Sequence, residues 1–98
     1  MNTVPSYRPE ADIFENNEEF VLFADVPGAT GDKVDVKLED GVLSLTADAE
    51  GRRWSRRFAV PRGIDGERIS AELRQGVLKI VLPKAESARA RRIAVAQA

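Results

Sequence analysis

Apolar and polar residues alternate along most of the chain, as in β-strands that place one face against a core. Residues 32–39 show the pattern best, since every second side chain is apolar and the others are charged. Residues 19–26 are apolar on both sides, which predicts a central strand covered on both faces and ended by Pro27-Gly28. Further strands are predicted at residues 12–15, 42–48, 54–60, 69–73 and 77–82.

Two similar octapeptides predict hairpins. LEDGVLSL (residues 38–45) and LRQGVLKI (residues 73–80) each place a glycine after two polar residues, where a positive φ closes a tight turn. Eight aligned positions are too few to establish an internal repeat. Residues 85–92 could form a helix, but they are polar and basic all round, so this helix would be marginal. Six to seven short strands predict an all-β fold, an antiparallel immunoglobulin-like β-sandwich.

Composition narrows the chemistry. A chain of 98 residues with 43% hydrophobic and 32% charged residues forms one globular domain. Cysteine and histidine are absent, which excludes disulfides, imidazole catalysis and the usual zinc ligands. We therefore expect no enzyme, no cofactor and no metal. The chain has no apolar run of membrane-spanning length and no signal-peptide pattern at its start, so we expect a cytoplasmic protein without membrane contact.

The near-neutral total hides an asymmetry of charge. Residues 1–50 carry twelve acidic and three basic side chains, and residues 51–98 carry four acidic and twelve basic ones. The halves could attract each other within one fold or between two copies. The simpler expectation is that strands from both halves interleave and mix their charges on the surface.

Two other functions have some support in the sequence. The stretch GRRWSRR (residues 51–57) combines arginines with an aromatic residue, as nucleic-acid binders do, but a hairpin with a charged edge strand is the favoured interpretation. A slightly acidic protein with one tryptophan is a poor match, so we expect no nucleic acid as a partner. An enzyme would have to use carboxylates alone, for instance Asp12 with Glu15 or Glu39 with Asp40 in a glycosidase-like pair, and both pairs fall where solvated turns are expected.

The residues resemble those of a known family. The chain is similar to the alpha-crystallin domain of the small heat shock proteins over residues 9–95. Five segments carry the resemblance in the family's order: ADIFENNEEFVLFADVPGA, VDVKLEDGVLSLTA, RRFAVP, ISAELRQGVLKIVLPK and RRIAV. The resemblance implies a chaperone that works without ATP and holds partly unfolded proteins in apolar grooves. The alternative is a related co-chaperone sandwich that docks on a larger ATPase chaperone.

The resemblance also implies site residues. It divides the chain into a short arm (residues 1–9), a sandwich (10–84) and a tail (85–98). Ile93 and Val95 of the tail would fill adjacent pockets of a groove, although a disordered tail is the simpler alternative. The implied groove, for clients or a tail, is lined by Val34, Val36, Leu38, Ile69, Ala71 and Leu73.

The side chain of Arg56 is expected on the same side of its strand as the apolar residues, and Arg56 matches an arginine that forms interface ion pairs in the family. We expect a carboxylate opposite it or, equally, a solvated edge position. The family's bacterial members exchange a long loop to dimerise, but here only residues 49–53 join two strands, which predicts a local hairpin. The family's apolar N-terminal arm is also reduced here to about nine polar residues, MNTVPSYRP. We therefore expect a monomer or dimer, no large cage and weakened activity, and the sequence leaves open whether the tail docks on its own chain or a neighbour's.

Overall fold

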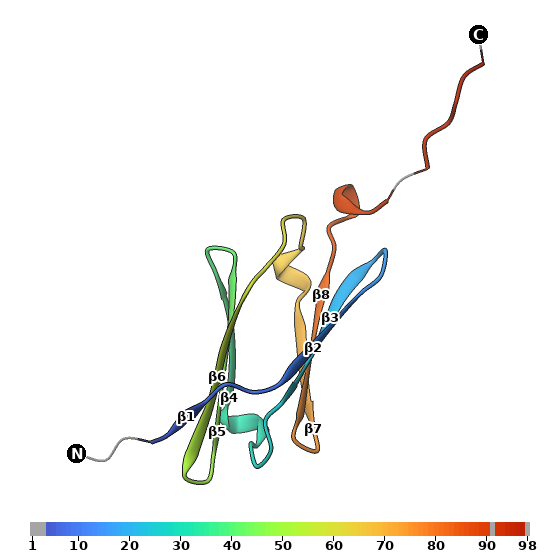
Figure 1. Cartoon of the computed structure of the whole chain (residues 1–98). Coiled ribbons are helices and arrows are strands. Elements are labelled where there is room, and N and C mark those ends of the chain that lie inside the picture. Colours follow the sequence, from blue (N-terminus) through green and yellow to red (C-terminus); the bar gives the residue numbers. More distant parts are fainter. Residues whose placement is uncertain (1–3, 91, 98) are drawn as a thin grey trace.

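The structure is a computed structural model, and it describes residues 4–90 and 92–97. Two four-stranded sheets pack face to face (Figure 1), in the orders β1-β6-β5-β4 and β2-β3-β8-β7. This confirms the predicted all-β sandwich. The strands are β1 (Ser6–Tyr7), β2 (Ala11–Glu15), β3 (Glu19–Asp25), β4 (Val34–Glu39), β5 (Val42–Ala49), β6 (Arg52–Ala59), β7 (Ser70–Arg74) and β8 (Val77–Pro83).

Both predicted hairpins form. Asp40 and Gly41 between β4 and β5 have φ values of 52° and 75°, and Gln75 and Gly76 between β7 and β8 have 49° and 77°. Two central residues with positive φ twist the turn in the sense of the flanking strands, and glycine at the second position adopts this without a Cβ clash. β5 and β6 are joined by residues 50 and 51 alone, so the predicted local hairpin also forms.

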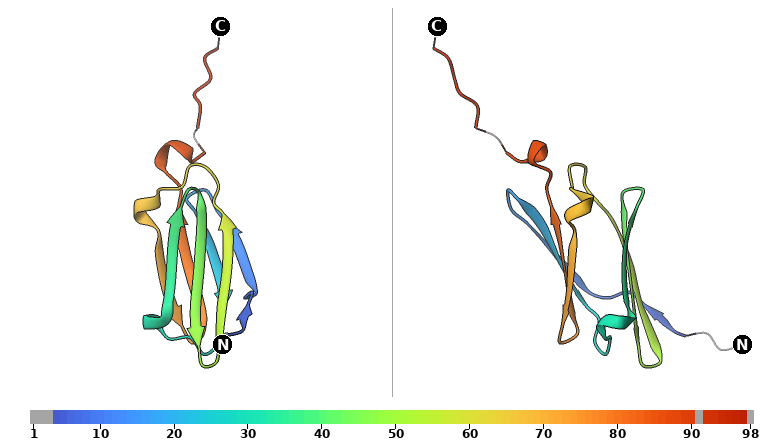
Figure 2. Two further views of the ribbon diagram at one scale, coloured as in Figure 1. Left: turned by 90° about the vertical axis from the view of Figure 1, so that its left-hand side faces the viewer. Right: turned by 180° about the vertical axis from the view of Figure 1, so that it is seen from behind.

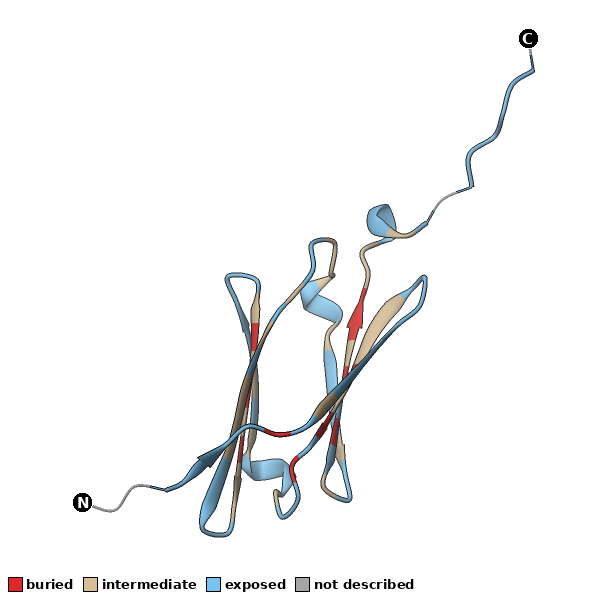
Figure 3. Ribbon diagram, viewed as in Figure 1, coloured by how far each residue is buried: buried red, intermediate tan, exposed pale blue. Residues whose placement is uncertain are grey.

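The core lies between the sheets, on the inward faces of the central strands (Figure 3). Each sheet draws strands from both halves of the chain, so the acidic and basic halves interleave as expected. The fully packed residues are Leu22, Ala24, Val26, Leu43, Leu45, Ala47, Leu78, Ile80 and Leu82. The outer face of β3 is only half-buried, and Phe14 packs edge-to-face on Phe23 there with ring centroids 5.9 Å apart. The expectation that β3 is covered on both faces is therefore wrong.

A short N-terminal segment joins the two sheets, and the sequence pattern did not predict it. β1 runs parallel to β6, an exception to the expected antiparallel pairing, and residues 8–10 then cross to β2 in the other sheet (Figure 1). Pro9 in this crossing segment is fully buried. The arm predicted at residues 1–9 thus contributes to the sandwich from residue 6 onward, while residues 1–3 lie outside the described residues.

The structure has 3₁₀ turns at three places where the sequence pattern predicted a strand, a helix or no regular element. Gly31–Lys33 (η1) occupies the start of the strand predicted at 32–39, and Gly66–Arg68 (η2) precedes β7. The marginal helix at 85–92 is reduced to Glu86–Ala88 (η3), because its polar residues have no apolar face to bury. The tail then leaves one end of the sandwich (Figure 2). Within residues 4–90 and 92–97, no helix has the length and apolar character of a membrane span.

Candidate functional site

One open border of the sandwich lies between β4 and β7, which are the edge strands of the two sheets on that side. A cavity of about 260 Å³ opens there, and we refer to it as the β4–β7 groove. Its lining is mainly apolar and comes from both strands, from η2 and from the start of β5. The lining residues are Val36, Leu38, Leu43, Gly66, Ile69, Ser70 and Ala71.

The predicted groove residues divide into two groups. Val36, Leu38, Ile69 and Ala71 line the cavity together, and Leu38 is 40% exposed there. Val34 and Leu73 pack against the core, as Val36 and Ile69 also do, but they do not belong to the lining.

Three lining residues were not found from the sequence. Leu43 follows the β4–β5 turn on the inward face, so the strand pairing could have pointed to it. Gly66 had no such signal, because its role is spatial: a Cβ at this position would lie 3.2 Å from Leu38 Cδ2. Ser70 stands next to Ile69 and likewise had no distinguishing pattern.

A second cavity opens at the opposite border, between β2 and β6, with a volume of about 250 Å³. We call it the β2–β6 groove. Its lining is apolar, and the residues include Ile13, Phe20, Leu22, Phe58, Val60 and Leu82. Ile13 lies on the inward side of the edge strand β2, opposite Leu22, yet it is 56% exposed because the facing sheet leaves this end uncovered. Leu43 borders both grooves and is itself buried.

Arg56 lies between the sheets, as its parity with the apolar residues of its strand predicts. It is paired with the buried Leu45 on β5, and its guanidinium carbon is 4.7 Å from the centre of the Phe58 ring. Its Nη1 donates a hydrogen bond of 3.0 Å to the Pro9 carbonyl oxygen, and its Nε is buried without a partner. Within the part of the chain that the structure describes, no carboxylate forms an ion pair with Arg56. A carboxylate from a second copy stays a prediction.

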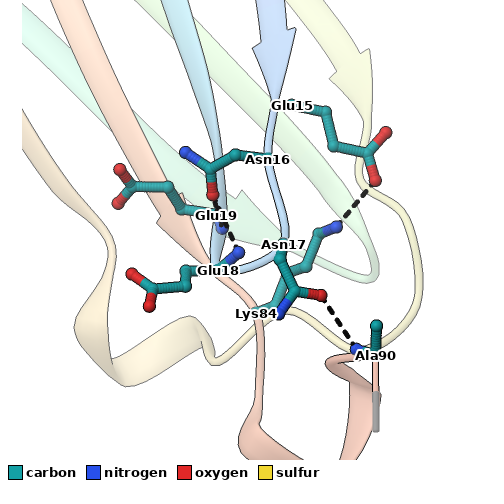
Figure 4. Close-up of polar contacts among 7 residues, drawn as sticks. All are labelled: Glu15, Asn16, Asn17, Glu18, Glu19, Lys84 and Ala90. Carbon is teal, nitrogen blue, oxygen red and sulfur yellow. Dashed lines mark hydrogen bonds and ion pairs between the residues drawn. The ribbon is translucent and has the colours of Figure 1, made fainter. Parts of the chain in front are cut away.

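The root of the tail is held on the β2–β3 hairpin (Figure 4). Lys84 Nζ lies 2.7 Å from Glu15 Oε2, and the Lys84 backbone N–H donates to the Glu18 carbonyl. Further on, the Ala90 N–H donates to Asn17 Oδ1 at 3.0 Å. Beyond this root, Ile93 and Val95 are 83% and 92% exposed, so neither side chain occupies a groove of its own chain in this structure.

Comparison with known proteins decides the family. The Hsp20/alpha crystallin family matches residues 12–96. The chain belongs to the Hsp20/alpha crystallin family. Membership in this family supports a chaperone role in general and agrees with the resemblance that the five sequence segments indicate.

Individual relatives of this Hsp20 chain agree with the match. Small heat shock protein C4 of Rickettsia felis is 28% identical over 89% of this chain, which spans 63% of that relative. A small heat-shock protein of Xylella fastidiosa, described as having a distinct high order structure, is 32% identical with a TM-score of 0.73, over 91% of this chain and 96% of that one. HspA of Xanthomonas axonopodis is 33% identical with a TM-score of 0.71, over 80% and 94%.

The arginines of the Hsp20 chain around Trp54 have partners within the fold. Arg53 Nε lies 2.7 Å from Asp48 Oδ1 across the β5–β6 hairpin, and this hydrogen bond lowers the pKa of the Asp48 carboxyl. Trp54 Nε1 donates to the Pro27 carbonyl at 3.2 Å, and the Arg52 guanidinium lies over the ring of Trp54. The stretch is thus part of the sandwich's own packing, but the interpretation as an edge strand is wrong at Arg53 and Trp54, because β1 pairs with β6 there.

The carboxylates considered for catalysis also have surface roles. Glu15 pairs with Lys84, and Glu39 pairs with Lys37 at 2.9 Å. Asp40 occupies the β4–β5 turn, and Asp12 is exposed on β2. No cluster of acidic side chains suited to a metal ion occurs within residues 4–90 and 92–97.

Proposed function

We propose that this Hsp20 chain is a holdase that works without ATP: it binds extended apolar segments of partly unfolded proteins and limits their aggregation. The observation that carries the proposal is the β4–β7 groove, an apolar cavity open to solvent between two edge strands. A holdase needs exposed apolar surface on a soluble framework and needs no reacting group.

The border can hold an extended segment. Edge strands present unpaired backbone N–H and C=O groups, and a peptide added there directs every second side chain toward the groove. Each aliphatic side chain that becomes fully buried contributes roughly 1.5–3 kcal/mol before ordering costs, so single contacts are weak and reversible. Ion pairs on the same strands, Lys37 with Glu39 and Arg74 with Glu72, keep the edges charged and oppose aggregation of the domain itself.

Self-association in this proposal stays small. Ile93 and Val95 are exposed and two residues apart, so one tail can place both side chains in a groove of a second copy. The two-residue turn between β5 and β6 is too short to exchange a strand with another subunit. We therefore propose a monomer or dimer that forms no large cage.

Light scattering of a heat-stressed client protein tests the proposal. We expect the intact chain to suppress scattering at a small molar excess, and Leu38→Ser to weaken the suppression. Val77→Ser is the matched control, since Val77 is an exposed aliphatic residue on β8 outside both grooves. Ile93→Ser combined with Val95→Ser, followed by sedimentation, then tests the role of the tail in assembly.

Two results would contradict the proposal. If the intact chain gives no suppression at stoichiometric excess, it is not a holdase, and binding to an ATPase chaperone would then favour the co-chaperone alternative. If Val77→Ser weakens suppression as much as Leu38→Ser, the activity does not depend on the β4–β7 groove.

A further inference from the structure

The outer face of the β2-β3-β8-β7 sheet carries a cluster of apolar side chains that the packing of a single chain does not fully bury. Leu22 on β3 and Ile80 on β8 point into the core, so their neighbours along each strand point outward. The strand register aligns these outward residues with those of β2. Phe14 is 59% exposed, and its ring packs edge to face on that of Phe23. The cluster, which we call the outer patch, consists of Phe14, Val21, Phe23 and Val81.

The outer face of the other sheet has a different character. Its central strand β5 directs Ser44 and Thr46 outward, and their partners on β6 are Arg57 and Ser55. A polar outer face is usual for an antiparallel sheet that has water on one side. The outer patch departs from this pattern, and contiguous apolar surface on a soluble domain marks a site of interaction. A covering layer would account for the apolar outer side of β3, which the core of one chain does not require.

Charged side chains divide the face around the outer patch into two halves. The outward charges of β2 and β3 are all acidic, and they are Asp12, Glu19 and Asp25. The other half, on β8 and β7, has Lys79, Arg74 and Glu72, and Arg74 Nη2 lies 3.1 Å from Glu72 Oε1. Lys79 forms no ion pair within residues 4–90 and 92–97. One half is therefore acidic, and the other has a cation available for a partner.

Such a face is complementary to a second copy of itself. A two-fold axis that runs parallel to the strands, between two outer faces, places the acidic half of each chain over the half of the other chain that contains Lys79. A two-fold axis perpendicular to the strands would place β2 over β2 instead, where like charges repel. We propose that two copies of this chain form a dimer by packing their outer patches face to face about the first of these axes.

The row of side chains through the middle of the patch fits this arrangement. The row crosses the four strands in the order Phe14, Val21, Val81 and Ser70. The rotation places the large ring of Phe14 over the small Ser70 of the second copy, and Val21 over Val81. Large side chains therefore meet small ones at the ends of the row, and aliphatic side chains meet in its centre.

The next row contains one favourable and one unfavourable contact. Phe23 comes over Lys79 of the second copy, where a cation meets an aromatic ring. Asp12 comes over Glu72, but Arg74 already pairs with that glutamate and reduces its negative charge. Sheets that pack face to face are also rotated by about 30° to one another, which separates the two carboxylates further.

The dimer leaves both grooves open. None of the four residues of the outer patch lines the β4–β7 groove or the β2–β6 groove. Dimer formation and client capture are therefore separate properties, and the inference does not rest on the proposed function. A dimer carries two β4–β7 grooves, which strengthens the hold on a client with several apolar segments.

Sedimentation of the full chain over a range of concentrations tests the dimer. We expect the wild type to show a monomer–dimer equilibrium, and Phe14→Ser to weaken it at least about tenfold, because each dimer loses two aromatic contacts. Val81→Ser should also weaken the dimer. Val42→Ser is the matched control, since Val42 is a half-buried valine on the outer face of the other sheet, and it should leave the equilibrium within about twofold.

Exchanging charges tests the orientation with exposed residues, so that folding is not at issue. Asp12→Lys places two cations over each other in the dimer, and Lys79→Glu places two carboxylates over each other, so each variant alone should dimerise less than the wild type. An equimolar mixture should form a heterodimer, because opposite charges then meet at both contacts. If Asp12→Lys dimerises more tightly than the wild type, β2 lies over β2 and the proposed orientation is wrong.

The absence of cysteine from the chain allows a direct test of position. A short bismaleimide cross-linker should join two chains of the Val81→Cys variant, because position 81 lies close to the two-fold axis. It should not join chains of Val42→Cys, which places its thiol on the opposite outer face. Cross-linking of Val42→Cys without cross-linking of Val81→Cys would assign the interface to the other sheet and overturn the proposal.

Three further results would also overturn it. The first is a wild type that sediments as a monomer at every concentration. The second is a dimer that survives Phe14→Ser and is lost when Ile93 and Val95 are changed to Ser, since the tail would then hold the dimer. The third is a monomeric wild type whose suppression of client aggregation is lost in Phe14→Ser, which would make the outer patch a client surface. Sedimentation involves no client, so these results are separate from the fate of the holdase proposal.

Discussion

The two open borders of the sandwich differ in how the chain covers them. At the β6–β2 border the crossing segment joins the sheets, buries Pro9 and leaves only one end open as the β2–β6 groove. At the β4–β7 border the connection from β6 to β7, which contains η2, passes between the sheets at one end of the seam, and the groove lies beside it. The same architecture thus gives one border that is open along its edges and one that is partly closed.

The charges at the two borders differ as well. β2 is acidic and has an exposed isoleucine and phenylalanine, while β4 and β7 carry mixed charges. Specificity for a charged segment comes from a border of one sign, whereas a mixed border accepts segments of varied charge. The two grooves of this small domain can therefore differ in the segments that they accept.

Leu43 separates the two grooves, and removing its side chain should have the largest effect on the stability of the domain. Its side chain is buried and borders both cavities. We expect Leu43→Ala to lower the free energy of unfolding by about 2–5 kcal/mol, because a buried leucine leaves a cavity. Urea denaturation measures the loss, and Val42→Ala, on the other face of β5, should cost about 1 kcal/mol. If the two variants lost the same free energy of unfolding, Leu43 would contribute no more to the core than Val42 does.

Arg56 holds the crossing segment, so its removal should affect only the β6–β2 border. We expect Arg56→Ala to lower the free energy of unfolding by about 1–3 kcal/mol, because the buried Pro9 carbonyl loses its donor. Hydrogen exchange should rise at the Arg53 amide, which donates to the Pro5 carbonyl in the same segment. Arg57→Ala is the control, since Arg57 is exposed and faces outward. Faster exchange in β4 instead of at Arg53 would contradict this role.

Much of the β4–β7 border could be predicted from the sequence, because its signals are local. Alternation marks β4, and the glycines at 41 and 76 mark the turns that place β4 beside β5 and β7 beside β8. That β4 and β7 face each other came from the resemblance to a family, since pairing across sheets has no signature in the pattern. Val34 and Leu73 were assigned to the groove because alternation gives the face of a residue but not how far the cavity extends.

The β6–β2 border could not be predicted in the same way. β1 has only two residues, which are too few to show an alternating pattern. It forms because it pairs with the free edge of β6, a strand more than forty residues further along the sequence. The alternation along β6 indicated that the Arg56 side chain points inward. Its hydrogen-bond acceptor is a backbone carbonyl, and such an acceptor cannot be recognised from residue types. One signal was present: Ile13 and Phe14 are adjacent apolar residues in a short strand, so one of them had to face outward.

Substitution of Gly66 is the change with the smallest expected effect, and it alters the β4–β7 groove alone. A methyl group at this position would lie 3.2 Å from Leu38 Cδ2, which must shift by a few tenths of an ångström and narrow the β4–β7 groove. The φ angle of Gly66 is not in the left-handed region, so alanine fits the backbone and should stabilise the fold by about 0.4–1 kcal/mol. We expect Gly66→Ala to reduce the suppression of client aggregation by about twofold without lowering stability.

Gly31→Ala is the matched control for this change, because a Cβ there has no atom within 4 Å and the backbone is again compatible. It should gain similar stability and keep full suppression. If Gly31→Ala weakened suppression as much as Gly66→Ala, the loss would not come from a narrower β4–β7 groove, and the contact between position 66 and Leu38 would have no role in client binding.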